Sequence, residues 1–230
     1  MSDNIVGEEK ANCMNPAAAL RTTTLGFRPE SKPREYLETG TALDALTQGF
    51  PRGAISEITG PDSSGRTAVA HAVLAAATTK LEICAYVDTN DSLDPCSGAA
   101  AGIALDRLIW VRCGGNTEHA MKAADNLLHA GGFGVVVLDL CHVSERVARR
   151  IPLSYWYRFR LAIENTPSIL LLVEREPLAK SCAALMLDMK RNRAMWTGAP
   201  GFRLLRGIEV QASRRKPVAQ ASACALKLAV

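Results

Sequence analysis

Hydrophobic and polar positions alternate in two different ways along the chain. Between residues 54 and 174, apolar runs of five to seven residues alternate with longer segments in which apolar residues recur every three or four positions. This pattern predicts strands at 54–58, 82–87, 107–111, 135–140 and 168–174, and helices at 67–79, 93–102, 117–130 and 153–165. Continuous apolar strands that alternate with helices are typical of an α/β fold whose mostly parallel sheet has helices on both faces.

The pattern becomes β-like after residue 181. Segments 183–190, 194–197, 202–212 and 223–229 carry strand-forming residues and are separated by Gly, Pro and Asn turns. We therefore expect an antiparallel β extension at the C-terminal end of the parallel core.

The first 36 residues have no sustained period. They mix Asn, Pro, Thr, Glu and Lys, so we expect a partly disordered N-terminal arm with a short helix near 16–21 that can serve as a docking element. Residues 37–230 are expected to form one domain.

Composition excludes disorder as the main state, because 48% of the 230 residues are hydrophobic and 22% are charged.

The net charge of +4 is unevenly distributed along the chain. Residues 1–140 carry 11 basic and 17 acidic side chains, whereas residues 141–230 carry 16 basic and six acidic ones. The basic second half favours an acidic partner, either single-stranded DNA or an acidic protein surface.

Seven widely spaced cysteines include no C-x-x-C pair, which is typical of thiols in a reducing compartment. The N-terminus lacks the features of a signal peptide, and no apolar run reaches the length of a membrane span. We expect a cytoplasmic protein with no membrane association.

A glycine-rich motif between the first predicted strand and helix carries the chemistry. It reads G-x-x-x-x-G-R-T, and this strand–loop–helix context is the one that a phosphate-binding P-loop requires. Its glycines allow backbone N–H groups to face phosphate oxygens, and the helix adds a positive N-terminal dipole. The predicted nucleotide-binding residues of this loop are Gly60, Pro61, Asp62, Ser63, Ser64, Gly65, Arg66 and Thr67.

A second motif follows about 70 residues later. The apolar strand 135–138 ends in Asp139, the pattern of a Walker B strand whose carboxylate supports a metal ion. Thr67 and Asp139 are therefore the expected Mg²⁺ residues if nucleotide binds. Arg66 departs from the motif, because a P-loop has Lys there, and the planar guanidinium meets phosphate with a different geometry.

Segments 39–46, 49–67 and 84–95 resemble, in order and spacing, the core of the RecA recombinase family. The Leu-Asp-Pro sequence at 93–95, which follows a predicted strand, is a specific part of this resemblance. It covers roughly residues 38–175 and implies a RecA-like fold with ATP and Mg²⁺ as cofactors. The family's C-terminal domain has no counterpart here, and segments 141–152 and 176–182, which match its DNA-contacting loops, are short and lack Gly.

The resemblance also identifies altered catalytic positions. Asn90 stands where the family has a Glu that activates water, and an amide cannot accept that proton. Glu174 ends the strand where the family has an Asn-Gln pair that senses the γ-phosphate. Together with Arg66, these changes imply weak or absent ATP binding and no efficient ATPase activity.

The remaining sequence, including 187–198 and 204–217, looks like the shorter RecA-like proteins of the ImuA type. This resemblance implies an accessory role in SOS-induced translesion synthesis and DNA repair, through binding to RecA or to a Y-family-like polymerase subunit. It also implies self-association through the N-terminal arm. The alternatives are an active DNA-dependent ATPase that forms RecA-like filaments and a cell-division inhibitor of the SulA type.

Two basic clusters in the second half are expected to contact DNA or a partner protein. The basic side chains of these clusters can bind phosphates, and Trp196 can stack on bases. The predicted contact residues are Arg146, Arg149, Arg150, Lys190, Arg191, Arg193 and Trp196.

Overall fold

The computed structural model describes residues 34–199, 201–217 and 223–229, which belong to one compact unit that begins at Arg34. The predicted helix at 16–21 and nearly all of the predicted arm lie outside the described residues.

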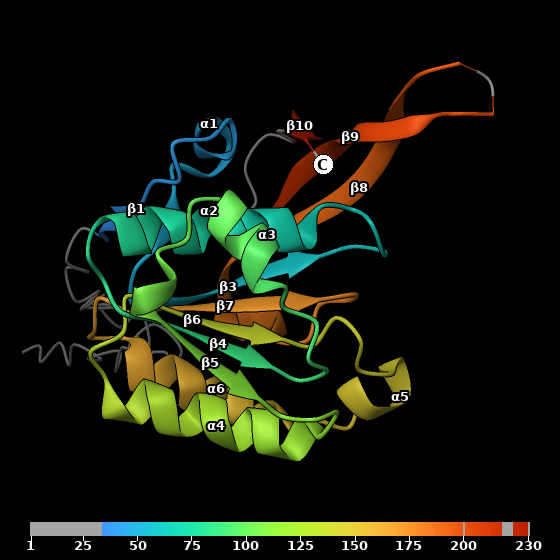
Figure 1. Ribbon diagram of the computed structural model, residues 1–230. Coiled ribbons are helices and arrows are strands. Elements are labelled where there is room, and N and C mark those ends of the chain that lie inside the picture. Colours follow the sequence, from blue (N-terminus) through green and yellow to red (C-terminus); the bar gives the residue numbers. More distant parts are fainter. Residues whose placement is uncertain (1–33, 200, 218–222, 230) are drawn as a thin grey trace, which may run out of the picture. The chain divides into compact units, whose positions relative to one another are not determined.

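An eight-stranded sheet organises this unit, in the order β10-β9-β8-β3-β7-β6-β4-β5 (Figure 1). Each adjacent pair from β8 through β3, β7, β6 and β4 to β5 is parallel, and β9 is antiparallel to both β8 and β10. The α/β fold with a mostly parallel sheet and an antiparallel C-terminal extension is confirmed. The strands are β3 (Ala54–Thr59), β4 (Cys84–Asp88), β5 (Leu108–Arg112), β6 (Val135–Asp139), β7 (Ile169–Glu174), β8 (Ala183–Thr197), β9 (Leu204–Lys216) and β10 (Ala223–Ala229), with a separate pair of β1 (Tyr36–Leu37) and β2 (Phe50–Pro51).

Helices cover both faces of the sheet (Figure 1). One core lies between the sheet and α1 and α2, and a second lies between the sheet and α4 and α6, where Trp156 and Phe159 are fully buried. Because both faces are covered, every residue of β3, β4, β6 and β7 is buried, which explains their continuous apolar sequences. The helices are α1 (Leu43–Thr47), α2 (Arg66–Thr79), α3 (Pro95–Ala100), α4 (Thr117–Ala130), α5 (Glu145–Ala148) and α6 (Leu153–Ile163), with 3₁₀ turns η2 (Leu105–Arg107) and η3 (Lys180–Cys182).

Two predicted elements differ from the structure. The helix expected at 93–102 is only α3, because Asp94 accepts hydrogen bonds from the N–H groups of Cys96 and Ser97 and so fixes its start. The turn expected at 191–193 is absent. β8 continues through these residues as one strand of 15 residues. β9 pairs with β8 on both sides of this position, and the pairing register shifts between Arg191 and Arg193. Cross-strand pairing thus overrides the local turn preference of Asn192.

Within the part of the chain that the structure describes, no helix has the length and hydropathy needed to cross a membrane. The six cysteines in these ranges form no disulfide. His, Cys, Asp and Glu side chains make no group of three or more there that could hold a metal ion.

Candidate nucleotide site

The P-loop joins β3 to α2 as the sequence predicts. Gly60 and Gly65 have φ angles of 148° and 89°, in the region that favours glycine. A Cβ at Gly60 would collide with the backbone oxygen of Met189, so β8 packs directly against the start of the loop. Both glycines are therefore required by the backbone turn, and Gly60 is also required by the close approach of a strand more than 120 residues away in sequence.

Buried polar groups in this loop lack partners. Ser64 Oγ and Arg66 Nη1 are buried and have no hydrogen-bond partner among the described residues. The N–H of Val69 donates to the Gly65 carbonyl, so the N–H groups that precede it have no helical acceptor. Unsatisfied donors at a helix N-terminus fit an anionic group such as phosphate.

A cavity of about 530 Å³ adjoins these groups. Its walls come from residues 63–68 on one side and from the antiparallel strands on the other, where Arg191, Trp196 and Leu228 contribute. Arg191 and Trp196 were predicted to contact DNA or a partner, and the structure places both at the edge of the P-loop cavity.

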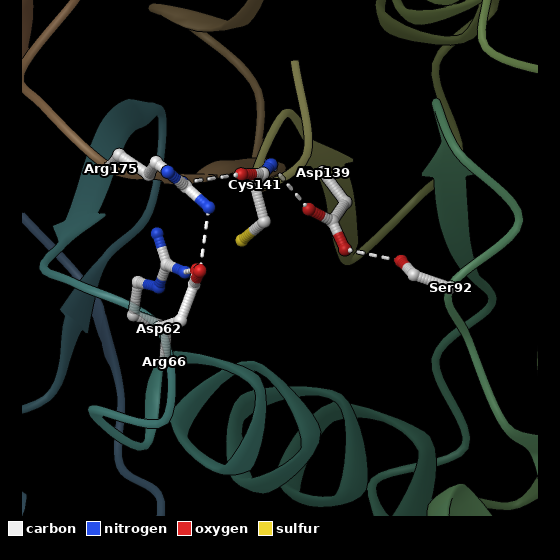
Figure 2. Close-up of polar contacts among 6 residues, drawn as sticks. All are labelled: Asp62, Arg66, Ser92, Asp139, Cys141 and Arg175. Carbon is white, nitrogen blue, oxygen red and sulfur yellow. Dashed lines mark hydrogen bonds and ion pairs between the residues drawn. The ribbon is translucent and has the colours of Figure 1, made fainter. Parts of the chain in front are cut away.

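Arg66 is held by a contact that the motif does not predict. Its side chain is only 6% exposed, and Nη2 lies 3.1 Å from a carboxylate oxygen of Asp62 in the same loop. Arg175, which follows β7, places its own Nη2 2.6 Å from the other oxygen of Asp62 and donates from Nε to the Cys141 carbonyl (Figure 2). We call this arrangement of Arg66, Asp62 and Arg175 the clasp.

The clasp affects both the binding of an anion and the position of the loop. Asp62 places a negative charge beside the guanidinium that would meet phosphate, so phosphate must compete with a carboxylate for the same donors. Arg175 also accepts the Gly60 N–H on its backbone oxygen, at 3.2 Å, and thereby ties the start of the loop to the end of β7.

Asp139 lies at the end of β6, as predicted for a Walker B residue, and is 5% exposed. Its carboxylate accepts hydrogen bonds from Tyr86 Oη at 2.7 Å, from Ser92 Oγ at 3.1 Å and from the Cys141 N–H at 2.9 Å. Burial and the charge of Asp139 raise the pKa of Tyr86, which keeps its hydroxyl protonated as a donor. A carboxylate has about four acceptor positions, so only one remains for a metal ion or its water.

Asn90 lies apart from the P-loop cavity. It is exposed and lines an open cavity of about 520 Å³ together with residues 114–118, 142–144 and 147. No P-loop residue is among the described residues that line this cavity. The amide therefore faces the loop that follows β6.

Glu174 ends β7 and is 1% exposed. Burial and the neighbouring negative charge of Glu57 on β3 raise its pKa well above the ordinary value for Glu. Glu57 accepts the N–H groups of Leu178 and Ala179, at 2.8 and 2.5 Å, and Glu174 accepts the same Leu178 N–H at 3.2 Å. The two carboxyl groups therefore form a buried acid pair that holds the chain after β7.

The predicted contact residues fall into two places. In and after α5, Arg149 pairs with Glu145 and, at 3.2 Å, with Glu176, while Arg146 and Arg150 are exposed. In β8, Arg193 lies 3.3 Å from Glu209, and Trp196 is 56% exposed. The remaining residues, Lys190 and Arg191, are exposed on the same strand.

Several residues of this region were not identified from the sequence. Phe202, 84% exposed, together with Arg203 and Arg206, extends the basic and apolar surface of β8 to the far end of the hairpin, which projects from the sheet in Figure 1. Glu57 had a usable signal, since a lone charged residue within an apolar strand indicates a buried partner. Arg175 had none, because its partner Asp62 is 113 residues away in sequence.

Comparison with known proteins agrees with this geometry. Residues 25–148, more than half of the chain, match the family described as RecA N-terminal domain. The chain belongs to this family. It is 41% identical over 118 residues to Protein RecA of Bifidobacterium longum (50% of this chain, 29% of the relative) and 33% identical over 143 residues to Protein RecA of Streptococcus parasanguinis (58% and 37%).

Protein RecA of Borrelia hermsii is 34% identical over 118 residues, which cover 50% of this chain and 33% of the relative. The chain therefore spans about a third of the length of the curated relatives it matches. The matched region contains the P-loop and β6, so the RecA-like assignment rests on the segment that carries the candidate site.

Proposed function

We propose that this chain is a RecA-like accessory protein of DNA repair, of the ImuA type associated with translesion synthesis, whose ATP site is altered. The clasp is the observation that carries this proposal. It engages the guanidinium at the position of the P-loop lysine with a carboxylate of the same loop. Family membership supports the RecA-like part, and the altered site supports an accessory role over turnover.

The residues present fit a phosphate group better than a metal ion. The backbone of residues 63–67 with Ser64 and Arg66 would hold the phosphates, and Thr67 with Asp139 would hold Mg²⁺. ATP would supply a phosphoanhydride bond there. Hydrolysis also needs a group that positions and deprotonates water. Asn90 cannot accept a proton, and burial beside Glu57 raises the pKa of Glu174 well above its ordinary value, which disfavours the charged form of that carboxyl.

Binding of an ATP analogue tests the altered site. Because Asp62 competes with phosphate for Arg66, we expect Asp62→Asn to tighten binding of a fluorescent non-hydrolysable analogue about tenfold, which corresponds to about 1.4 kcal/mol. Glu176→Gln is the matched control, since it removes a nearby carboxylate that pairs with Arg149 outside the clasp. We expect less than about a twofold change for this control.

Turnover is measured on the same proteins with single-stranded DNA present. We expect no DNA-stimulated ATP hydrolysis by the natural chain. Robust turnover that Thr67→Ala abolishes would instead establish an active ATPase, and equal tightening by Asp62→Asn and Glu176→Gln would remove the clasp from the explanation.

We further propose that the β8–β9 hairpin contacts an acidic partner, with single-stranded DNA as the partner that its chemistry favours. Arg191 and Trp196 border the same cavity, Lys190 is exposed on the same strand, and Arg203, Arg206 and Phe202 are exposed at the far end of the hairpin. Guanidinium and ammonium groups bind backbone phosphates, and exposed aromatic rings stack on bases. RecA or a polymerase subunit would then dock elsewhere, and the arm at residues 1–36 is the proposed element.

Single-stranded DNA binding tests the hairpin. We expect Trp196→Ala to weaken binding of a fluorescein-labelled oligothymidylate about tenfold through lost stacking. Arg191→Gln should lower the salt slope by about 0.7 through one lost phosphate contact. Lys122→Gln on α4 serves as the charge-matched control, because this Lys pairs with Glu118 on the helix that covers the sheet's other face. Unchanged affinity and slope in both hairpin variants would eliminate the hairpin as the DNA contact.

A further inference from the structure

Another cavity lies at the opposite end of the parallel strands from the P-loop. The P-loop follows the carboxyl end of β3, whereas this cavity is bordered by the first residues of β8, which pair with the first residues of β3. The end of β9, the segment between α1 and β2 and the side chain of Arg160 from α6 complete its walls. Its volume is about 350 Å³.

Four cationic side chains line this cavity. They are Arg34, Arg160, Arg214 and Lys216, and no carboxylate is among the described residues that line it. Lys216 Nζ donates to the carbonyl oxygens of Lys180 and Ser181, at 3.5 and 3.0 Å. Within ranges 34–199, 201–217 and 223–229, none of the four side chains forms an ion pair with a carboxylate.

Two of the guanidinium groups have buried donors without acceptors. Arg160 Nε and Arg214 Nε are each inaccessible to solvent and have no hydrogen-bond partner among the described residues. Arg160 lies over the ring of Tyr157, 5.1 Å from its centre, which fixes the guanidinium without satisfying its N–H groups. Neither arginine forms an ion pair in the described part of the chain.

Neighbouring arginines on the same elements behave differently. Arg158, two residues before Arg160 on α6, lies 2.8 Å from Asp125, and Arg215, next to Arg214 on β9, lies 2.7 Å from Asp188. On both α6 and β9, the arginine that points away from the cavity pairs with a carboxylate. The arginine that lines the cavity has no such partner among the described residues. Buried donors and like charges without a counter-ion are unfavourable, so an anion that filled the cavity would relieve both costs.

We propose that this cavity binds a phosphate group. A phosphate carries up to two negative charges and three acceptor oxygens, and guanidinium groups bind such oxygens in pairs. A single carboxylate would leave most of the four positive charges uncompensated. The phosphate can belong to a small phosphorylated molecule, which brings up to two negative charges on one group, or to a nucleic-acid backbone, which brings one negative charge on each successive phosphate. Guanidinium groups bind the phosphate oxygens of both. This inference does not depend on the proposed function of the P-loop.

Pyrophosphate binding by calorimetry tests the site, in the Arg66→Gln background so that the P-loop guanidinium does not contribute. The paired variant Arg160→Gln, Arg214→Gln should weaken binding about 10- to 100-fold, because two charge-assisted contacts are lost. The matched control Arg158→Gln, Arg215→Gln removes the same charge from the same two elements and should change affinity less than about twofold. Equal weakening in both pairs, or no saturable binding before substitution, would overturn the proposal.

Thermal unfolding without phosphate separates binding from a structural role. The site pair should unfold at the same or a higher temperature than its parent, because it relieves repulsion between unpaired charges. A clear drop would assign the two arginines to the fold instead. Labelled oligothymidylate then identifies the source of the phosphate. Weakened oligonucleotide binding in the site pair points to a nucleic-acid backbone, and unchanged oligonucleotide binding with weakened pyrophosphate binding points to a small phosphorylated molecule.

Discussion

A chain that carries Arg66→Lys, Asn90→Glu and Glu174→Gln together should hydrolyse ATP about 100-fold faster than the natural chain in the presence of single-stranded DNA. This increase of about 100-fold is at the lower end of the rate enhancement that a general base typically contributes. Each substitution reverses one of the three departures from the related family. Lys lacks the fork with which Arg66 meets Asp62, Glu at position 90 can accept a proton, and Gln at position 174 returns the amide found in the related family.

The single substitutions distinguish the contributions. Asn90→Glu alone should leave turnover near the natural level, because the clasp still engages Arg66 and limits ATP binding. The triple variant with Thr67→Ala added is the control for contaminating ATPase. A triple variant no faster than this control would show that groups outside these three positions, such as those of a neighbouring subunit, limit hydrolysis.

Glu57→Leu should lower the free energy of unfolding by about 3 kcal/mol. The substitution leaves the Ala179 N–H buried without an acceptor, weakens the hold on Leu178 and removes the partner of Glu174. Chemical denaturation at neutral pH measures this loss. Glu174→Gln is the matched control, because the amide resembles the protonated carboxyl and should leave stability equal or slightly higher.

The pH dependence of unfolding gives an independent readout of the same pair. Since the pKa of Glu174 is raised in the folded state, the unfolded chain releases this proton first as the pH rises above about 4.3. The free energy of unfolding therefore falls across that window, by at most about 1.4 kcal/mol per pH unit, and levels off above the folded pKa. Glu174→Gln should remove this fall. A variant that keeps the natural pH profile would show that Glu174 ionises normally in the folded protein.

The sequence by itself determined the fold class and the place of the P-loop. Continuous apolar runs and helical periodicity are local patterns, and a strand, a glycine loop and a helix in that order leave few alternatives. For the same reason Asp139 was correctly placed at the end of β6, because an apolar run that stops at a carboxylate marks the edge of a buried strand.

Tertiary structure decided which side chains meet. Arg175 reaches Asp62 because β7 lies beside β3 in the sheet. Arg191 and Trp196 border the P-loop cavity because β8 lies on the other side of β3. Arg160 and Arg214 line one cavity at the opposite end of the sheet. Periodicity assigns elements but carries no information on strand order or register, since these depend on the packing of distant segments. The contacts that pair Arg66 with a carboxylate, raise the pKa of Glu174 and gather four cations in one cavity are therefore visible only in the folded chain.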